Sequence, residues 1–290
     1  MSLHTLIPVV LQASLLLSVF VIGLKASAHA ATYLFRRPRE LFRALVAMYV
    51  LMPLFAIAVV LLFDLNPVVK IALVALSVSP IPPLLPNKML KKGASDSYAI
   101  GLLMAAGLLA TVVVPLSMEL LKEVFNVPLQ MTIASVAKLI FATILLPIGL
   151  GVAFSGIAPA LAERLAKPIS QIAGVGLLVA TVMILFGAAP AIWTLIGNGT
   201  VIGLAAFVLV GLAIGHFLGG PKPENRIALA ISTSSRHPGV AIAIAAANFP
   251  EQKLATAAVL LYLLVGAVVS IPYHRWMKRQ EPYVETRVKE

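Results

Sequence analysis

The sequence contains no cysteine, few charged residues and no acidic residue deep inside its apolar segments. Of the 290 residues, 11% are charged and 60% are hydrophobic, and the mean hydropathy is +1.01. The absence of cysteine excludes disulfides, cysteine-ligated metals and cysteine nucleophiles. A soluble domain has roughly a quarter of its residues charged. The composition therefore predicts an all-α polytopic membrane protein that lies in the lipid bilayer.

All eleven Asp and Glu residues fall in loops, at predicted helix ends or in the C-terminal tail. A carboxylate inside the membrane would be the usual ligand for Na⁺ or the usual proton carrier of a coupled pump. The sequence also has no zinc motif, no G-x-S-x-G and no paired carboxylates, so we expect no enzyme, no metal and no cofactor. The net charge of +11 lies in short clusters, as topology signals do. We find no nucleic-acid-binding motif and expect no nucleic-acid partner.

Apolar runs of about 20 residues, the length that spans the hydrocarbon core, predict nine transmembrane helices. They cover residues 4–28, 39–63, 68–93, 95–120, 128–154, 169–190, 199–218, 224–249 and 252–276. The amphipathic stretch 158–170 is expected to lie on the membrane surface as a separate element. The first apolar run is too long for a signal peptide and has no preceding Lys or Arg, so we expect it to be retained.

The basic clusters define an orientation. If the N-terminus is outside, the clusters at 36–43, 91–92, 164–167, 222–226 and 275–279 all lie on the cytoplasmic side, as the positive-inside rule requires. We therefore predict an N-out, C-in protein of the bacterial inner (plasma) membrane.

Two of the predicted spans are interrupted. The third contains Pro80, Pro82, Pro83 and Pro86, and the eighth contains Pro238 and Gly239. Two broken helices in corresponding positions are the best sequence indication of a transporter's binding site. They divide the chain into a first inverted repeat of four spans over 1–127, a second of five spans over 128–280, and a cytoplasmic tail over 281–290.

Arg236 lies beside the second break, where an unpaired charge costs roughly 3 kcal/mol or more. It either binds an anionic substrate or replaces a metal cation, or it caps the carbonyls that end the first half of its own segment. These interpretations are compatible. The other candidate substrate-binding residues around the two breaks are Ser232, Thr233, Ser234, Ser235, His237, Pro238, Asn87 and Lys88.

Several of these candidates have an alternative role. His237 can carry a proton or act as a hydrogen-bonded structural residue. The hydroxyl groups can line a cavity or bond back to helix carbonyls, and Lys88 can extend to the cytoplasmic surface. Two overlapping G-x-x-x-G units, formed by Gly211, Gly215 and Gly219, predict close helix packing rather than a nucleotide loop.

Four motifs resemble the bile acid:sodium symporter family, which is related in fold to the sodium/proton antiporters. They are VIGLKAS followed by FRRPRE, LMPL at 51–54, SVAKLIFATILLPIGLGVAF at 135–154 and GVAIAIAAANF at 239–249. The resemblance implies a panel domain and a core domain, with two broken helices crossing at the substrate site. Members of the family often have ten spans, so the resemblance also implies that the usual first span is missing.

The departures from the family concern its sodium ligands. Sodium-coupled members carry a carboxylate and a Gln in the second crossover helix, where this chain has Ser232 and Arg236. A further family Gln aligns with Met48, and the expected hydroxyl ligands fall in the apolar run 102–114. The resemblance therefore implies that the usual Na⁺ ligands are absent.

These observations predict a secondary active or facilitative transporter that moves a small organic anion by alternating access, without Na⁺ coupling. One alternative is a Na⁺-coupled, bile-acid-like anion symporter. A second alternative is a non-transporting receptor or scaffold that keeps the same fold. The sequence leaves the oligomeric state open.

Overall fold

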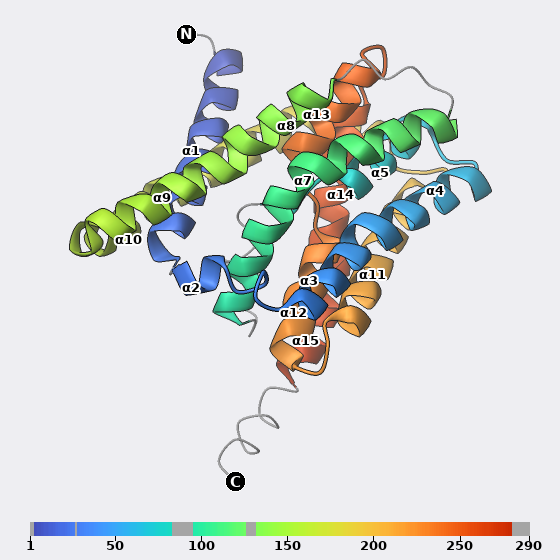
Figure 1. Ribbon diagram of the computed structural model, residues 1–290. Helices are drawn as coiled ribbons and strands as arrows, with labels where there is room; N and C mark the ends of the chain where they lie inside the picture. The colour runs from blue at the N-terminus through green and yellow to red at the C-terminus, as the bar shows by residue number, and fades with distance from the viewer. Residues whose placement is uncertain (1–2, 27, 83–94, 126–131, 280–290) are drawn as a thin grey trace.

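The computed structural model describes residues 3–26, 28–82, 95–125 and 132–279. All regular elements in these ranges are helices, as Figure 1 shows. They are α1 (Leu3–Lys25), α2 (Ala28–Ala31), α3 (Pro38–Leu45), η1 (Val46–Leu51), α4 (Met52–Leu62), α5 (Pro67–Val78), α7 (Asp96–Phe125), α8 (Ile133–Ile140), η2 (Phe141–Leu145), α9 (Leu146–Ile157), α10 (Pro159–Thr194), α11 (Thr200–Leu218), α12 (Pro223–Ser234), α13 (Pro238–Asn248), α14 (Ala255–Val269) and α15 (Ile271–Lys278). The prediction of an all-helical membrane protein is confirmed.

Seven helical segments in the described ranges are long and apolar enough to cross a membrane. They are Leu6–Lys25, Pro38–Leu62, Ser97–Glu123, Ala137–Ile157, Pro159–Thr194, Thr200–Leu218 and Ala255–Met277. Each overlaps one of the seven predicted spans that contain no interruption. The two interrupted spans correspond to shorter helices, α5 and the pair α12 and α13. The count of nine spans and the N-out, C-in orientation stay predictions.

One long helix differs from the sequence-based expectation. We expected residues 158–170 to form a separate surface element, but they are the first turns of α10, a single helix of 36 residues. Pro168 removes one backbone hydrogen bond. The first glycine of α10 is Gly174, so no glycine near Pro168 offers the left-handed conformation that ends many helices. The chain therefore continues through Pro168 without a break.

Two short π-helical stretches, η1 and η2, have a common local cause. Each ends just before a residue–proline pair, Met52-Pro53 in one case and Leu146-Pro147 in the other. A π-turn joins a carbonyl to the N–H five residues later, and proline has no N–H to offer. In η1 this leaves the carbonyl of Met48 without its π-helical donor.

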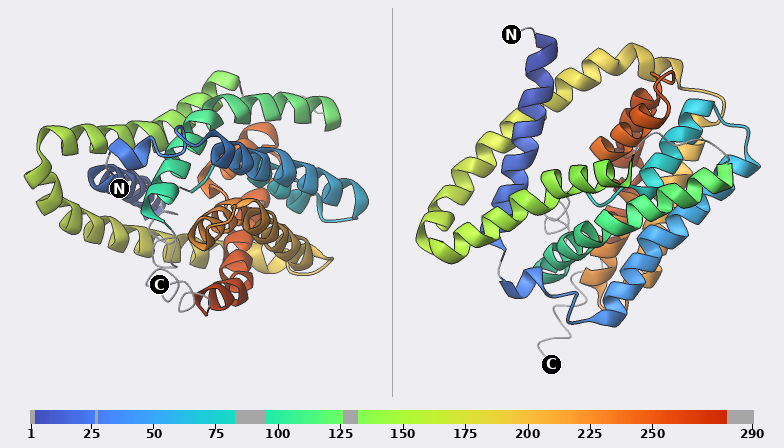
Figure 2. Two further views of the ribbon diagram at one scale, coloured as in Figure 1. Left: turned by 60° about the horizontal axis from the view of Figure 1, so that its bottom comes forward. Right: turned by 45° about the horizontal axis from the view of Figure 1, so that its top comes forward.

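The helices pack in two groups. In the first, α1 packs against both α9 and α10. In the second, α5, α11, α12, α13 and α14 pack on one another. The views in Figure 2 show the same separation from two further sides. The assignment of these groups to a panel and a core domain stays a prediction.

Gly211 and Gly215 of α11, and Gly219 directly after it, lie against α12. A Cβ atom at Gly215 would come within 2.4 Å of the Cα atom of Ala230, and one at Gly211 within 2.7 Å of that of Ser234. At Gly219 the corresponding approach, to the Cα atom of Arg226, is 2.4 Å. Only glycine fits at such distances, so the prediction of close helix packing is confirmed. The partner is the first half of the second interrupted segment.

Candidate functional site

The first break begins where α5 ends. Ser79 follows Val78 in an extended conformation, with ψ of 149°, and its hydroxyl donates to the carbonyl of Leu76 at 2.9 Å. Pro80 comes next and cannot continue the helix, because it lacks a backbone N–H. Pro80 and Pro82 therefore lie in irregular chain. The other predicted residues of this segment, Pro83, Pro86, Asn87 and Lys88, lie outside the described residues.

The second break consists of three residues, Ser235, Arg236 and His237, between α12 and α13. Pro238 is the first residue of α13 and Gly239 the second. They therefore lie just after the break that they were expected to form. This is physically reasonable, since proline fits the first position of a helix, where its missing N–H costs nothing.

The two breaks are in direct contact. The backbone N–H of His237 donates to the carbonyl of Pro80 at 2.9 Å. One guanidinium nitrogen of Arg236, Nη1, donates to the carbonyl of Ser79 at 3.3 Å. Residues about 157 positions apart in the sequence are thus joined through backbone oxygens that the end of α5 leaves without helical partners.

Arg236 also bonds to a third element. Its second terminal nitrogen, Nη2, donates to the carbonyl of Met48 in η1 at 2.6 Å, and the residue is fully buried. The guanidinium therefore joins η1 to the end of α5. The prediction that Arg236 caps the first half of its own segment is wrong, because both acceptors belong to other elements.

A tyrosine that we did not identify from the sequence caps that first half instead. The hydroxyl of Tyr262 donates to the carbonyl of Ser234 at 2.6 Å and accepts from the backbone N–H of Arg236 at 3.0 Å. It therefore satisfies one backbone group on each side of the break. The only signal in the sequence is that a tyrosine in an apolar run needs a polar partner for its hydroxyl.

The charge of Arg236 has no acidic counterpart in the described part of the chain. The two ion pairs found there, Arg37 with Glu40 and Lys122 with Glu119, involve other residues. Backbone carbonyl dipoles, including those at the negative end of α5, compensate the guanidinium instead. Its Nε atom is buried and has no hydrogen-bond partner among the described residues. The site is thus a positive charge enclosed by neutral oxygens, and the Nε–H group is not bonded to any described residue.

His237 has a structural role in this conformation. Its Nδ1 atom accepts a hydrogen bond from the backbone N–H of Val240 at 3.4 Å and caps α13. An acceptor nitrogen carries no proton, so this cap requires the neutral ring with its proton on Nε2. His237 is buried, with 6% of its surface exposed, and Pro238 beside it is half-buried.

The hydroxyl groups before the break bond within α12. Ser232 donates to the carbonyl of Ala228 and Thr233 to that of Leu229, each at 2.8 Å. Ser234 donates to the carbonyl of Ile231 at 3.2 Å. These side chains are buried, while Ser235, in the break itself, is half-buried. In this conformation the hydroxyls of α12 bond to the backbone of their own helix.

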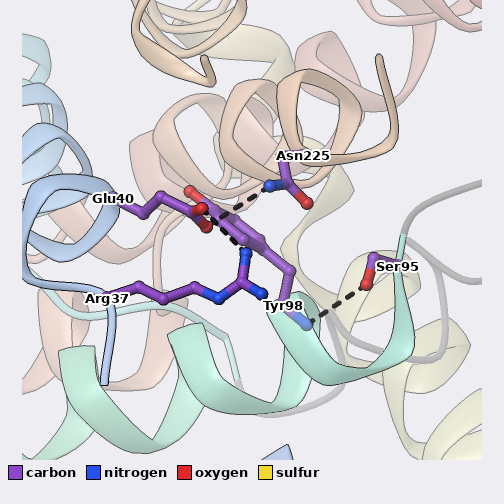
Figure 3. A network of polar contacts seen from close by, with 5 residues as sticks. All are labelled: Arg37, Glu40, Ser95, Tyr98 and Asn225. Atoms are coloured by element: carbon purple, nitrogen blue, oxygen red, sulfur yellow. Dashed lines mark hydrogen bonds and ion pairs between the residues drawn. The ribbon is translucent and has the colours of Figure 1, made fainter. Parts of the chain in front are cut away.

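A second polar cluster lies where α3, α7 and α12 begin, and Figure 3 shows it. Glu40 accepts from Arg37 at 3.1 Å and from the Nδ2 atom of Asn225 at 3.4 Å, while the N–H of Tyr98 donates to Ser95 at 3.5 Å. Asn225 is 2% exposed and links the start of α12 to α3. This cluster therefore fixes the end of α12 that lies far from Arg236.

The ring of Tyr33 lies next to this cluster. The Arg37 guanidinium carbon is 4.3 Å from the centre of that ring. Partial burial and, second, the Glu40 carboxylate raise the pKa of Tyr33. The cluster therefore also holds the turn between α2 and α3.

One family comparison gives a match. The profile of the sodium bile acid symporter family matches residues 13–195, well over half of the chain. A comparison with curated proteins finds no match. The matched range includes Met48 and the first break and ends before α12. The residues of the second break therefore have to be interpreted from their own geometry.

Proposed function

Because the chain belongs to the sodium bile acid symporter family, we propose that it is a multi-pass protein of the bacterial inner membrane that moves a small organic anion. Transport is secondary active or facilitative and proceeds by alternating access. The substrate binds where the two interrupted segments meet, and Arg236 provides the positive charge. The protein performs no enzymatic reaction and needs no Na⁺.

The contact between Arg236 and two backbone carbonyls is the observation that carries this proposal. In secondary transporters, the unwound backbone of broken helices offers carbonyl oxygens to Na⁺. Here the carbonyls of Met48 and Ser79 already accept from the guanidinium. A positive charge that is covalently part of the chain therefore joins η1 to α5, and a mobile cation is not required for this contact.

Two donors support an anionic substrate. The Nε atom of Arg236 has no partner among the described residues, and the cap made by His237 leaves its proton on Nε2. Charge-assisted hydrogen bonds from such donors to a carboxylate or sulfonate are stronger than those between neutral groups. When the site opens, these neighbouring residues can bind the oxygens of one anionic group.

The direct test is uptake into proteoliposomes, with taurocholate and short monocarboxylates as labelled probes. We expect the same uptake in Na⁺ and in choline media. We expect Arg236→Gln to abolish it, while Arg275→Gln, a change at an exposed position, leaves it unchanged. Each variant is first checked for a monodisperse, folded preparation.

The alternatives give different results in the same experiment. Uptake that requires Na⁺ would establish a sodium-coupled anion symporter. Saturable binding of a probe without uptake would establish a receptor or scaffold. Full uptake by a well-folded Arg236→Gln variant would show that Arg236 has only a structural role.

A further inference from the structure

A hollow of about 310 Å³ lies at one end of the helix group formed by α1, α9 and α10. Its polar lining consists of Lys25 from α1, Ser155 from α9, and Glu163 and Lys167 from α10. Leu24 contributes an apolar part of the lining. In Figure 1 the turn between α9 and α10 lies beside the end of α1 that leads into α2. The hollow is distant in sequence from both breaks and plays no part in the proposed transport site.

The charges around the hollow form no ion pair with the residues that the structure describes. Glu163 and Lys167 are four residues apart on one helix, in the order that favours an ion pair. The ion pairs in the described part of the chain nevertheless involve neither of them, nor Lys25. Two ammonium groups and one carboxylate therefore border a single hollow and remain available to an external ligand.

The position of the hollow favours a lipid as that ligand. The basic residues near 164–167 are those that place this turn at the cytoplasmic boundary of the membrane. Leu178 and Val182, further along α10, are 65% and 56% exposed. Leu178 is eleven residues after Lys167, about three turns on the same side of the helix and roughly 16 Å deeper. An acyl chain can lie along this surface while its headgroup fills the hollow.

We propose that the hollow binds the headgroup of phosphatidylethanolamine. The phosphate lies between the ammonium groups of Lys25 and Lys167 and accepts a hydrogen bond from the Ser155 hydroxyl. The primary ammonium of the headgroup donates to the carboxylate of Glu163. Basic pockets between helices on the cytoplasmic side commonly bind lipid headgroups. The carboxylate of Glu163 favours a headgroup that carries a hydrogen-bonding cation. Phosphatidylglycerol has no cation for Glu163, and the quaternary choline of phosphatidylcholine cannot donate a hydrogen bond to it.

Native mass spectrometry of the purified protein tests this assignment, with phosphatidylethanolamine, phosphatidylglycerol and phosphatidylcholine of identical chains added one at a time. We expect phosphatidylethanolamine to bind most tightly to the wild type. Lys25→Ala and Lys167→Ala should each weaken its binding about fivefold, as expected for one basic residue near the membrane surface. Lys253→Ala, which removes the same charge from an exposed position in another part of the chain, is the matched control and should change nothing.

Glu163→Gln distinguishes recognition of the whole phosphatidylethanolamine headgroup from attraction of its phosphate by the two lysines alone. It should weaken the binding of phosphatidylethanolamine and strengthen that of phosphatidylglycerol, which reverses or removes the preference. A preference that survives this substitution would overturn the assignment. So would equal lipid binding by the wild type and both lysine variants, because the hollow would then hold no headgroup. Thermal unfolding of each variant, measured without added lipid, shows that the substitutions act on binding and not on folding.

Discussion

Replacement of Arg236 by glutamine should make the stability of the protein depend on Na⁺. In the wild type the guanidinium donates to the carbonyls of Ser79 and Met48. The shorter glutamine amide cannot reach both elements, so at least one buried carbonyl loses its donor. The substitution also removes the positive charge that would repel a cation. The vacated oxygens are the kind of ligand that Na⁺ accepts from broken helices.

The change in the free energy of unfolding caused by Arg236→Gln can be estimated from two opposing effects. A buried carbonyl without a donor costs about 1–3 kcal/mol. Removal of an arginine charge that has no acidic partner relieves a desolvation penalty of several kcal/mol. These terms are of the same order and oppose each other, so we expect a small net change in the free energy of unfolding in Na⁺-free medium. The stabilisation of the variant by Na⁺ can be estimated directly. A vacated site that bound Na⁺ with a Kd of about 10 mM would add about 1.6 kcal/mol of stability at about 150 mM Na⁺.

Thermal unfolding in detergent, compared in sodium, potassium and choline chloride at equal ionic strength, measures this effect. We expect identical midpoints for the wild type in all three salts and a higher midpoint in sodium for Arg236→Gln. Arg236→Met is the control that removes the charge without adding an amide oxygen. A wild type stabilised by sodium, or an Arg236→Gln variant indifferent to all three cations, would refute the idea that the guanidinium replaces a mobile ion.

Substitutions at three further positions, Tyr262, Gly215 and His237, test the packing and the caps around the site. Tyr262→Phe leaves two backbone groups at the break without partners and should lower the free energy of unfolding by about 1–3 kcal/mol, seen as a lower melting midpoint. Gly215→Ala would place a Cβ atom within 2.4 Å of the Cα atom of Ala230, and such overpacking costs about 1–3 kcal/mol. Gly174→Ala, with nothing within 4 Å, should melt like the wild type. His237→Ala removes the cap of α13 and should cost about 1 kcal/mol, whereas the asparagine variant should recover most of that loss in the same melting assay.

The uninterrupted spans could be predicted from the sequence because the membrane itself sets their length. A run of about 20 apolar residues has no other stable arrangement in lipid than a helix, and all seven such runs are helical. The error at 158–170 has the opposite cause. Charged residues at a membrane boundary look the same whether their helix lies on the surface or enters the bilayer, so the amphipathic pattern could not distinguish the two.

The site was only partly predictable for a different reason. The position of Arg236 and the nearby proline indicated a break, since both are costly inside a continuous lipid-exposed helix. The acceptors of Arg236 are backbone oxygens, and every residue has one. The carbonyl of Met48 is free because the π-helical turn η1 ends before Pro53. It meets Arg236 only because two segments 188 positions apart pack together. No residue type marks such a carbonyl, and the same limitation concealed the role of Tyr262.

The charge of the substrate determines the electrical work of the proposed transport, and the fixed charge of Arg236 determines which step of the cycle carries it. A site that holds one monovalent anion is neutral, whereas the empty site returns with one positive charge. Each cycle would therefore move one negative charge with the substrate, worth about 2.3 kcal/mol per 100 mV, or about a 50-fold change in accumulation. In Na⁺-free proteoliposomes, an inside-positive potassium diffusion potential should increase anion uptake and an inside-negative one should decrease it. A carrier that brought in more than one Na⁺ with each anion would respond with the opposite sign. Uptake that is equal at both polarities would mean that a monovalent cation, such as a proton, accompanies each anion.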